Sequence, residues 1–518
     1  MIGSELLVQA AISAGIEVCF ANAGTTEMPI VTALDRIPGI RAVLGLFEGV
    51  CTGAADGYGR MAGKPAMTLL HLGPGFANGI ANLHNARRAH TPVLNIVGDH
   101  ATWHRGADAP LTMDIETLVG TVSGWQRSVG SIETIVRDIE EAIAAARKGQ
   151  VASLIVPQDI QWSKGLDVSG GLTFSGFDPV DQESIESAAR LMRATTPTAL
   201  ILGRQSLRRH GLEAAARIRA VLECDLLCET FPAYMERGAG FPLVQRIPYF
   251  PEQAIALLSK YRAVVLAGAR EPVAFFGYKG KPSYFLTDDQ PRVHSGTGGQ
   301  DAGEALEHLA DALGAPPAAR GAKGIYADLD LPDLPQGDIT PEKACAVLTA
   351  VQPENAVIVE EAVTTGFGYG FSPSTAAPHS YITITGGSIG QGIPCAAGAA
   401  LACPGRRVIN LQADGSAMYT LQGLWTQTRQ GLDVTTLICN NKSYHILQVE
   451  LERDGMTSLG SNTLALTSLD NPAIKWRNLS EGLGVPAVTA WDCETLAKEL
   501  RRSLDRPGPF LIEMMLRT

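Results

Sequence analysis

The chain has 518 residues, with 55 glycines, 53 acidic side chains and 42 lysines and arginines. Its net charge of −11, with histidine counted as neutral, leaves no basic face for nucleic acid, which we therefore exclude as a main partner. At about 150 residues per domain, this length predicts roughly three domains that can bury large cores. The glycine content exceeds the usual ~7 % without a collagen-like period, which indicates tight turns and close backbone contacts.

The cysteines and the N-terminus indicate where the protein resides. Nine cysteines are an odd number, and only Cys224 and Cys228 lie close together in the sequence. This pattern completes no zinc site, so we expect reduced, buried thiols and a cytoplasmic protein. The first residues lack the basic segment of a signal peptide and are expected to form a helix. Because no apolar run reaches ~18 residues, no membrane partner is expected.

The first third of the chain alternates short apolar strands with helices of small residues. The elements expected in chain order are a helix at 4–14, strands at 17–20 and 41–46, a helix at 52–61, a strand at 66–71, a helix at 79–89 and a strand at 93–97. This alternation predicts a parallel sheet covered by helices on both faces.

The middle and last thirds are separated by segments of linker composition, at 165–177 and at 315–337. Further strands and helices are expected at 198–203, 211–222, 263–268, 356–359, 392–402, 407–411, 434–439 and 510–514. We therefore predict an α/β protein of three doubly wound parallel-sheet domains. Their expected boundaries are 1–165, 180–312 and 338–518.

The strongest chemical signal lies in the last third. An apolar strand ends at Asp414, and the next strand ends at the pair Asn440 and Asn441, with 24 residues between Gly415 and Asn440. Neighbouring parallel strands place their carboxyl ends side by side, where such sheets bind ligands. One carboxylate and one amide are hard oxygen donors that suit Mg²⁺ or Ca²⁺, and Mg²⁺ held by so few protein ligands normally shares its coordination sphere with a diphosphate. Taken separately, a helix cap and a turn explain these residues equally well.

This segment resembles the cofactor motif of the thiamin-diphosphate enzymes, which is Gly-Asp-Gly followed some two dozen residues later by Asn-Asn. Here Ala413 stands in place of the first glycine. The resemblance implies thiamin diphosphate and Mg²⁺ as cofactors, with the metal held by Asp414, Asn441 and the carbonyl of Ser443. Further matches run in order along nearly the whole chain. They are closest to large-subunit homologues of acetolactate synthase, and they also resemble benzoylformate decarboxylase.

The same resemblance implies a glutamate in the N-terminal third that meets the aminopyrimidine ring of the cofactor. Glu48 follows the expected strand at 41–46 and precedes a small-residue helix ending in Asp-Gly-Tyr-Gly-Arg at 56–60, which is similar to the family pattern. A carboxyl hydrogen-bonded to the ring promotes proton removal from the reactive carbon, so Glu48 is expected to be catalytic. The alternative is a carboxylate placed at a helix start by the helix dipole.

Substrate contacts are implied near two glycine-containing segments. The segment at 22–29 resembles the substrate-side loop of both enzymes, with Gly24 and Thr25 facing the reacting carbon. His71, before Leu72 and a Gly-Pro-Gly loop, stands where benzoylformate decarboxylases carry a catalytic histidine. We expect His71 to be catalytic and Leu72 to contact the substrate. A loop histidine bonded to backbone is the alternative.

The resemblance also implies a set of cofactor contacts in both end domains. The Gly387 carbonyl would accept a hydrogen bond from the amino group of the aminopyrimidine, and Ile389 would bend the cofactor. For Ile389 the alternative is an ordinary core residue. For Thr364 and Thr365 it is a pair of exposed turn residues. The complete set is Asn78, Thr364, Thr365, Gly387, Ile389, Gly415, Ser416, Tyr444, His445 and Ile446.

The reaction implied is decarboxylation of a pyruvate-like 2-oxo acid, with carboligation of the remaining fragment to a second carbonyl compound. A simple decarboxylase that releases an aldehyde is the alternative, although the stretch at 272–278 lacks the second histidine of benzoylformate decarboxylases. A non-catalytic cofactor-binding homologue is the alternative of another class. Retention of Glu48, Asp414 and Asn441 argues against it. The glycine spacing does not fit a nicotinamide dehydrogenase.

Assembly and further cofactors also follow from the resemblance. The cofactor is expected to bridge the first domain of one subunit and the last domain of another, so a homodimer is the minimum and a homotetramer is expected. FAD is not expected, because Gln150 and Val151 replace the family's Gly-Pro. His100 and His104 lie near a loop at 106–111 that resembles acetolactate synthases, and neither has an assigned role.

Overall fold

The computed structural model describes all residues except 166–175, 319–321, 323, 372–374, 457 and 518. Its chain forms two compact units. The first unit contains residues 1–176, 359–363 and 384–518, and the second contains 177–358 and 364–383. The expected linker at 165–177 lies almost wholly outside the described residues, as does part of the one at 315–337.

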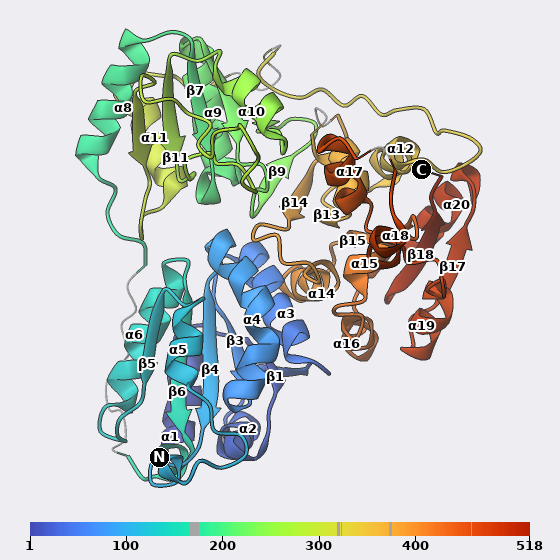
Figure 1. The fold of residues 1–518 in the computed structure, drawn as a ribbon. Coiled ribbons are helices and arrows are strands. Elements are labelled where there is room, and N and C mark those ends of the chain that lie inside the picture. Colours follow the sequence, from blue (N-terminus) through green and yellow to red (C-terminus); the bar gives the residue numbers. More distant parts are fainter. Residues whose placement is uncertain (166–175, 319–321, 323, 372–374, 457, 518) are drawn as a thin grey trace. The chain divides into compact units, whose positions relative to one another are not determined.

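The first unit begins with a six-stranded parallel sheet in the order β2-β1-β3-β4-β6-β5 (Figure 1). Its strands are β1 (Val18–Asn22), β2 (Arg41–Leu44), β3 (Ala66–Leu70), β4 (Val93–Asp99), β5 (Trp125–Ser128) and β6 (Val151–Pro157). The helices are α1 (Gly3–Ser13), α2 (Met28–Arg36), α3 (Glu48–Ala62), α4 (Leu72–Ala89), α5 (Ile115–Gly120), α6 (Ile135–Arg147) and α7 (Gln158–Trp162). Separate apolar cores lie on the two faces, because alternate strand residues such as Leu69 and Leu70 point to opposite sides.

Four strands of another sheet complete the first unit in the parallel order β17-β18-β16-β15. They are β15 (Val408–Ala413), β16 (Val434–Asn440), β17 (Ala487–Ala490) and β18 (Phe510–Met515). The accompanying helices are α14 (Gly392–Ala402), α15 (Asp414–Ala417), α16 (Gly423–Gln430), α17 (His445–Arg453), α18 (Ser461–Thr467), α19 (Trp476–Gly482) and α20 (Cys493–Leu504).

The second unit contains a five-stranded parallel sheet in the order β10-β8-β7-β11-β12. Its strands are β7 (Thr198–Leu202), β8 (Cys224–Cys228), β10 (Gln245–Arg246), β11 (Ala263–Ala267) and β12 (Arg292–Ser295). The helices are α8 (Gln182–Ala194), α9 (Arg209–Val221), α10 (Pro251–Leu258), α11 (Ala302–Ala312), α12 (Pro341–Val351) and α13 (Thr364–Gly370). An antiparallel pair, β9 (Met235–Arg237) and β14 (His379–Thr383), also lies here. β13 (Val357–Glu361) spans the boundary between the units.

The predicted fold class is confirmed, since the chain forms three parallel-sheet α/β domains. Two helices begin earlier than the sequence indicates. α3 begins at Glu48 instead of residue 52, and α4 begins at Leu72 instead of residue 79. Pro74 and its flanking glycines indicate a loop, yet first-turn amides have no intrahelical acceptor, so proline is tolerated there. The glycine-proline-glycine segment is therefore helical.

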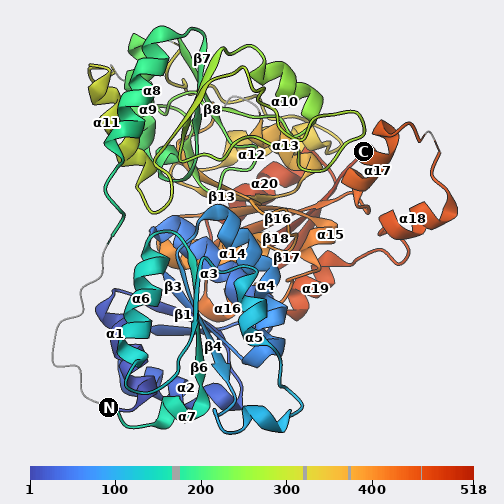
Figure 2. The ribbon, with the colours of Figure 1, turned by 60° about the vertical axis from the view of Figure 1, so that its left-hand side comes forward.

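Helices α3 and α14 meet at backbone contact within the first unit (Figure 2). A Cβ on Gly57 would lie 2.0 Å from the carbonyl oxygen of Cys395, and one on Gly398 would lie 1.8 Å from that of Ala54. Beside this contact, Arg60 Nε donates to buried Asp56 at 2.8 Å. Glycine is thus required at these positions by the close approach of two backbones.

In the described part of the chain, none of the helices combines the length and apolar character that spanning a membrane requires.

The helix contact can be tested by adding one methyl group. Gly398→Ala places a Cβ against the Ala54 backbone, and overpacking of this kind lowers the free energy of unfolding by about 1–3 kcal/mol. Urea unfolding monitored by tryptophan fluorescence measures the change. Gly482→Ala is the matched control, since this helical glycine in α19 has open space around it. Equal midpoints for the two variants would contradict the contact.

Candidate active site

Asp414 joins two neighbouring strand ends. β15 and β16 are paired with Ala413 opposite Cys439, so the residues that follow them meet at one edge of the sheet. The Asp414 carboxylate is buried, and its Oδ1 accepts from the Gly415 N–H at 2.8 Å. Its Oδ2 accepts from the Lys442 N–H, also at 2.8 Å. The predicted juxtaposition of these strand ends is therefore present.

The two asparagines after β16 have different surroundings. Asn440 is buried, and its Nδ2 donates to Glu513 Oε1 at 2.8 Å. Asn441 is partly exposed, and its Oδ1 accepts from the Ser443 N–H at 3.0 Å. Lys442 between them has a left-handed φ of 57°, which turns the chain back toward Asp414. Asn440 thus fastens the strand end, whereas Asn441 stays accessible to a ligand.

The donors at this edge fit a hard divalent cation. A carboxylate, an amide oxygen and the Ser443 carbonyl are all oxygen ligands, too few to enclose an ion without a ligand such as a diphosphate. Within the described residues, no group of three or more His, Cys, Asp and Glu side chains is suited to a metal, here or elsewhere. Burial raises the pKa of Asp414 to about 6, and backbone N–H bonds oppose this rise. A bound cation would favour the ionised carboxylate.

Glu361 holds the glycine-rich segment 386–392. This fully buried residue ends β13, and its carboxylate accepts from the N–H groups of Gly390 and Gly392. Gly390 has a φ of 98° and Gly387 one of 71°, conformations that favour glycine. Burial raises the pKa of Glu361 to about 7, against the opposing backbone hydrogen bonds. Sequence reasoning missed Glu361, whose only signal is an acidic pair ending an apolar strand.

Glu48 is buried at the first residue of α3. Its Oε2 accepts from Asn78 Nδ2 at 3.0 Å. A Cβ on Gly75 would lie 3.2 Å from its Oε1, so this glycine keeps space beside the second oxygen. The structure therefore places Asn78, an expected cofactor contact, against the expected catalytic carboxylate.

His71 is paired with a fully buried glutamate. His71 Nδ1 lies 2.8 Å from Glu27 Oε2, and Glu27 also accepts from the Gly24 N–H at 2.7 Å. Because a carboxylate at Glu27 accepts, His71 carries its proton on Nδ1 and donates it in this bond. The other ring nitrogen, Nε2, can then exchange a proton with a ligand. A Cβ on Gly98 would lie 1.7 Å from Glu27 Oε1. Sequence reasoning gave Glu27 no role, although it lies in the segment 22–29.

The remaining expected residues lie at element starts. Leu72 begins α4 with a left-handed φ of 54°, and Thr25 is exposed beside Gly24. Tyr444 covers Gly415, whose Cβ would lie 2.4 Å from the tyrosine ring. The others are Thr364 and Thr365 at the start of α13, half-buried Ile389, buried Ser416, and His445 and Ile446 at the start of α17.

Two groups of site residues stay separate. Among the described residues, no hydrogen bond or ion pair joins Glu48 to Asp414 or Asn441.

The rings of His100 and His104 lie 5.3 Å apart, edge to face, on the loop after β4. Their roles stay unassigned.

Known proteins resemble both ends of the chain. A family model described as the N-terminal TPP binding domain of thiamine pyrophosphate enzymes matches residues 1–118, and the corresponding C-terminal TPP binding domain matches 363–514. A Mycobacterium tuberculosis protein, whose name describes a candidate acetolactate synthase large subunit, is 46 % identical over 100 % of this chain and 99 % of its own. Benzoylformate decarboxylase of Pseudomonas aeruginosa is 28 % identical over 97 % of both chains.

A solved structure shares the fold. It is the thiamine diphosphate-dependent 4-hydroxybenzoylformate decarboxylase of Rhodococcus jostii RHA1, with a TM-score of 0.87 and 23 % identity, covering 100 % of this chain and 99 % of the other.

The raised pKa of Glu361 predicts a pH-dependent stability. Its folded pKa of about 7 exceeds the ordinary value of 4.5, so its contribution is complete below 4.5 and is lost as the pH rises through 7. The loss is roughly 3 kcal/mol in the free energy of unfolding. Glu361→Gln cannot ionise, so its unfolding free energy should fall less than that of the wild type between about pH 5 and pH 8. Exposed Glu354→Gln is the control, and parallel profiles for all three proteins would refute the assignment.

Proposed function

The chain belongs to the thiamine pyrophosphate enzyme family, and we propose that it decarboxylates a pyruvate-like 2-oxo acid and joins the remaining fragment to a second carbonyl compound. The observation that carries this proposal is the set of oxygen donors at the paired ends of β15 and β16. The 46 % identity to a protein named for acetolactate synthase favours carboligation over simple decarboxylation.

The residues at the edge of the sheet fit the cofactor's metal and diphosphate. Mg²⁺ would be held by Asp414, Asn441 and the Ser443 carbonyl, all oxygen donors. Gly415 and Ser416 would lie beside the diphosphate. When bound, thiamin diphosphate would supply a carbon acid whose deprotonated form is nucleophilic toward the 2-oxo group, and an electron sink for the loss of CO₂. The protein's own contribution is to bind, to orient and to move protons.

Glu48 and His71 divide the proton transfers. Glu48 would hold a proton at the aminopyrimidine nitrogen through Oε1, because Asn78 already donates to Oε2 and Gly75 leaves space beside Oε1. His71 would exchange a proton with the reacting oxygen or carbon through Nε2, because Glu27 accepts the Nδ1 proton. Glu27 is a positioning residue, since it acts on the reaction only through His71.

We propose that a second copy of the chain completes the site. The family resemblance implies that the cofactor lies between two subunits, so that one copy would supply Glu48 and another the metal ligands. This makes a homodimer the minimum active form, and we propose a homotetramer built from two such dimers.

A simple 2-oxo acid decarboxylase is the second candidate. The pair of His71 and Glu27 favours it, because a histidine could deliver the proton that replaces CO₂ on the reacting carbon before an aldehyde is released. The 28 % identity to benzoylformate decarboxylase also supports it.

Product analysis decides between these functions. The purified protein, saturated with thiamin diphosphate and Mg²⁺, is incubated with pyruvate and a panel of other 2-oxo acids, with and without an acceptor carbonyl compound. We expect acetohydroxy acids or 2-hydroxyketones, and a rate that saturates with the acceptor. Free aldehyde as the only product would replace carboligation by decarboxylation. Cofactor binding without turnover of any 2-oxo acid would favour a non-catalytic homologue.

The role of Glu48 has a separate test. Glu48→Gln should slow hydrogen–deuterium exchange at the reactive carbon of bound thiamin diphosphate by about 100-fold or more, because the carboxyl no longer holds the ring proton. Exchange is quenched with acid and measured by NMR. Glu116→Gln is the control, since Glu116 also lies in the first turn of a helix of the same unit. If both variants exchange at the wild-type rate, Glu48 has no catalytic role and is only a carboxylate that interacts with the helix dipole at the start of α3.

A further inference from the structure

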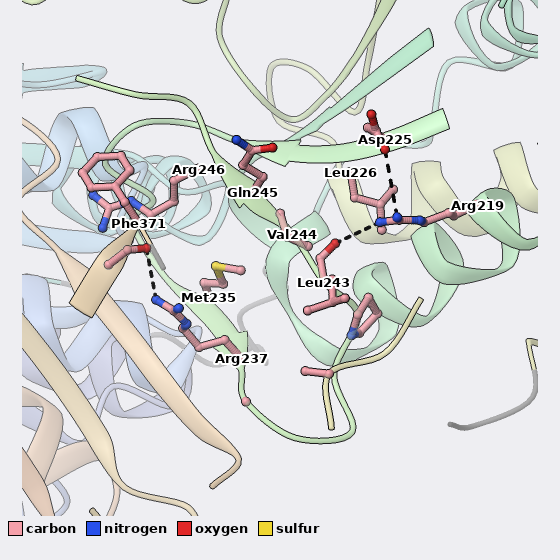
Figure 3. Close-up of a pocket in the computed structure, with 14 residues that line it drawn as sticks. Arg219, Asp225, Leu226, Met235, Arg237, Leu243, Val244, Gln245, Arg246 and Phe371 are labelled. Carbon is pink, nitrogen blue, oxygen red and sulfur yellow. Dashed lines mark hydrogen bonds and ion pairs between the residues drawn. The ribbon is translucent and has the colours of Figure 1, made fainter. Parts of the chain in front are cut away.

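The second unit contains a cavity of about 430 Å³ at the β10 edge of its five-stranded sheet (Figure 3). None of the residues assigned above to the cofactor or substrate lines it. Three arginines from different elements do so, namely Arg219 of α9, Arg237 of β9 and Arg246 of β10. A volume of this size suits a small organic ligand.

The charges are unevenly distributed in the cavity. At one end, Arg219 Nη2 lies 4.0 Å from Asp225 Oδ1, so this pair is formally neutral. Asp225 is the only acidic residue among those that line the cavity. Among the residues that line the cavity, Arg237 and Arg246 therefore contribute two positive charges at the other end, as Figure 3 shows, where Arg237 Nη1 also donates to the Gly370 carbonyl at 3.3 Å. That excess equals the charge of a phosphate monoester dianion, whereas a carboxylate would neutralise half of it.

Both arginines at the charged end are buried, with exposed fractions of 6 % for Arg237 and 3 % for Arg246. Burial lowers the pKa of Arg237, and the charge of Arg246 acts in the same direction. Both guanidinium groups also stack against the ring of Tyr381, at 5.2 Å and 5.7 Å. Two like charges held together away from water are unfavourable unless an anion or well-placed hydrogen bonds compensate them.

The hydrogen bonds of Arg246 leave donors for such an anion. Its Nε and Nη2 donate to the carbonyl of Thr230, and its Nη1 donates to the Tyr381 hydroxyl at 2.9 Å. A guanidinium has five N–H donors, so these three bonds leave two. No carboxylate in the described part of the chain lies within ion-pair distance of Arg246. The group thus keeps both charge and hydrogen-bonding capacity at the cavity wall.

Part of the remaining wall is apolar, although Gln245 also lines it. Leu226, Met235 and Val244 lie between the Arg219 end and the Arg246 end in Figure 3. A ligand that spans this stretch needs an apolar body, while its anionic group meets the two buried arginines. Bare inorganic phosphate would satisfy only the charged end.

We propose that this cavity binds a small organic phosphate, with a phosphate monoester at Arg237 and Arg246 and an apolar body along Met235 and Val244. The proposal is independent of the reaction proposed above, since none of the residues assigned to the cofactor or substrate lines the cavity.

Isothermal titration of the intact protein, saturated with thiamin diphosphate and Mg²⁺, tests this site. The probes are phenyl phosphate, benzoate and inorganic phosphate. We expect one phenyl phosphate per chain, bound at least about tenfold more tightly than either of the other two probes. No binding of phenyl phosphate at millimolar concentration, or equal affinity for benzoate, would overturn the proposal.

Three variants locate the bound phosphate. Arg246→Met should weaken phenyl phosphate binding at least about tenfold, through loss of charge and donors. Val244→Phe fills the cavity without replacing an arginine and should weaken binding as much. This variant tests the site even if Arg246→Met does not fold. Arg217→Met is the matched control on α9. Arg217 lies on the same helix as the cavity residue Arg219 and is similarly exposed, at 23 % against 25 %. It pairs with Asp311 outside the cavity, so its loss removes an arginine without changing the cavity wall. Unchanged binding in Val244→Phe, or an equal loss in Arg217→Met, contradicts the assignment.

Discussion

Buried carboxylates that accept backbone N–H groups organise the candidate active site. Asp414 binds the amides of Gly415 and Lys442, Glu361 binds those of Gly390 and Gly392, and Glu27 binds that of Gly24. Each carboxylate lies at or shortly after the carboxyl end of a strand, where the chain leaves the sheet. Since an unpaired buried carboxylate is strongly disfavoured, each loop is held in the one conformation that keeps its amides on the oxygens.

Glycines leave the space that these buried carboxylates occupy beside the main chain. Gly98 has no room for a Cβ because Glu27 lies against it, and a Cβ on Gly392 would lie 2.1 Å from Gln412 and 2.9 Å from Glu361. The high glycine content thus has a local explanation wherever a polar side chain or a second backbone reaches the main chain. Other glycines, including Gly106 and Gly130, have open space around them and need another account.

The features that could be predicted are those that depend on residues close together in the sequence. The parallel strands and the meeting of Asp414 with the turn after Asn440 follow from hydrophobic runs and chain connectivity. Glu27 and Glu361 were missed, because their roles come from contacts with residues distant in sequence. The helical starts at Glu48 and Leu72 were missed because glycine and proline resemble loop residues. The antiparallel β9 and the arginine cavity are likewise tertiary features.

The contact of α3 with α14 has a consequence during protein synthesis. Of the 15 residues in α3, 14 are buried, and the helix that packs on its glycines begins 330 residues after it ends. At about 5–20 residues per second, the ribosome needs roughly 15 to 70 s to supply that partner. Throughout this interval the nascent N-terminal domain presents an uncovered face of small apolar residues. Its productive folding in the cell therefore depends on keeping that face from other chains until α14 emerges.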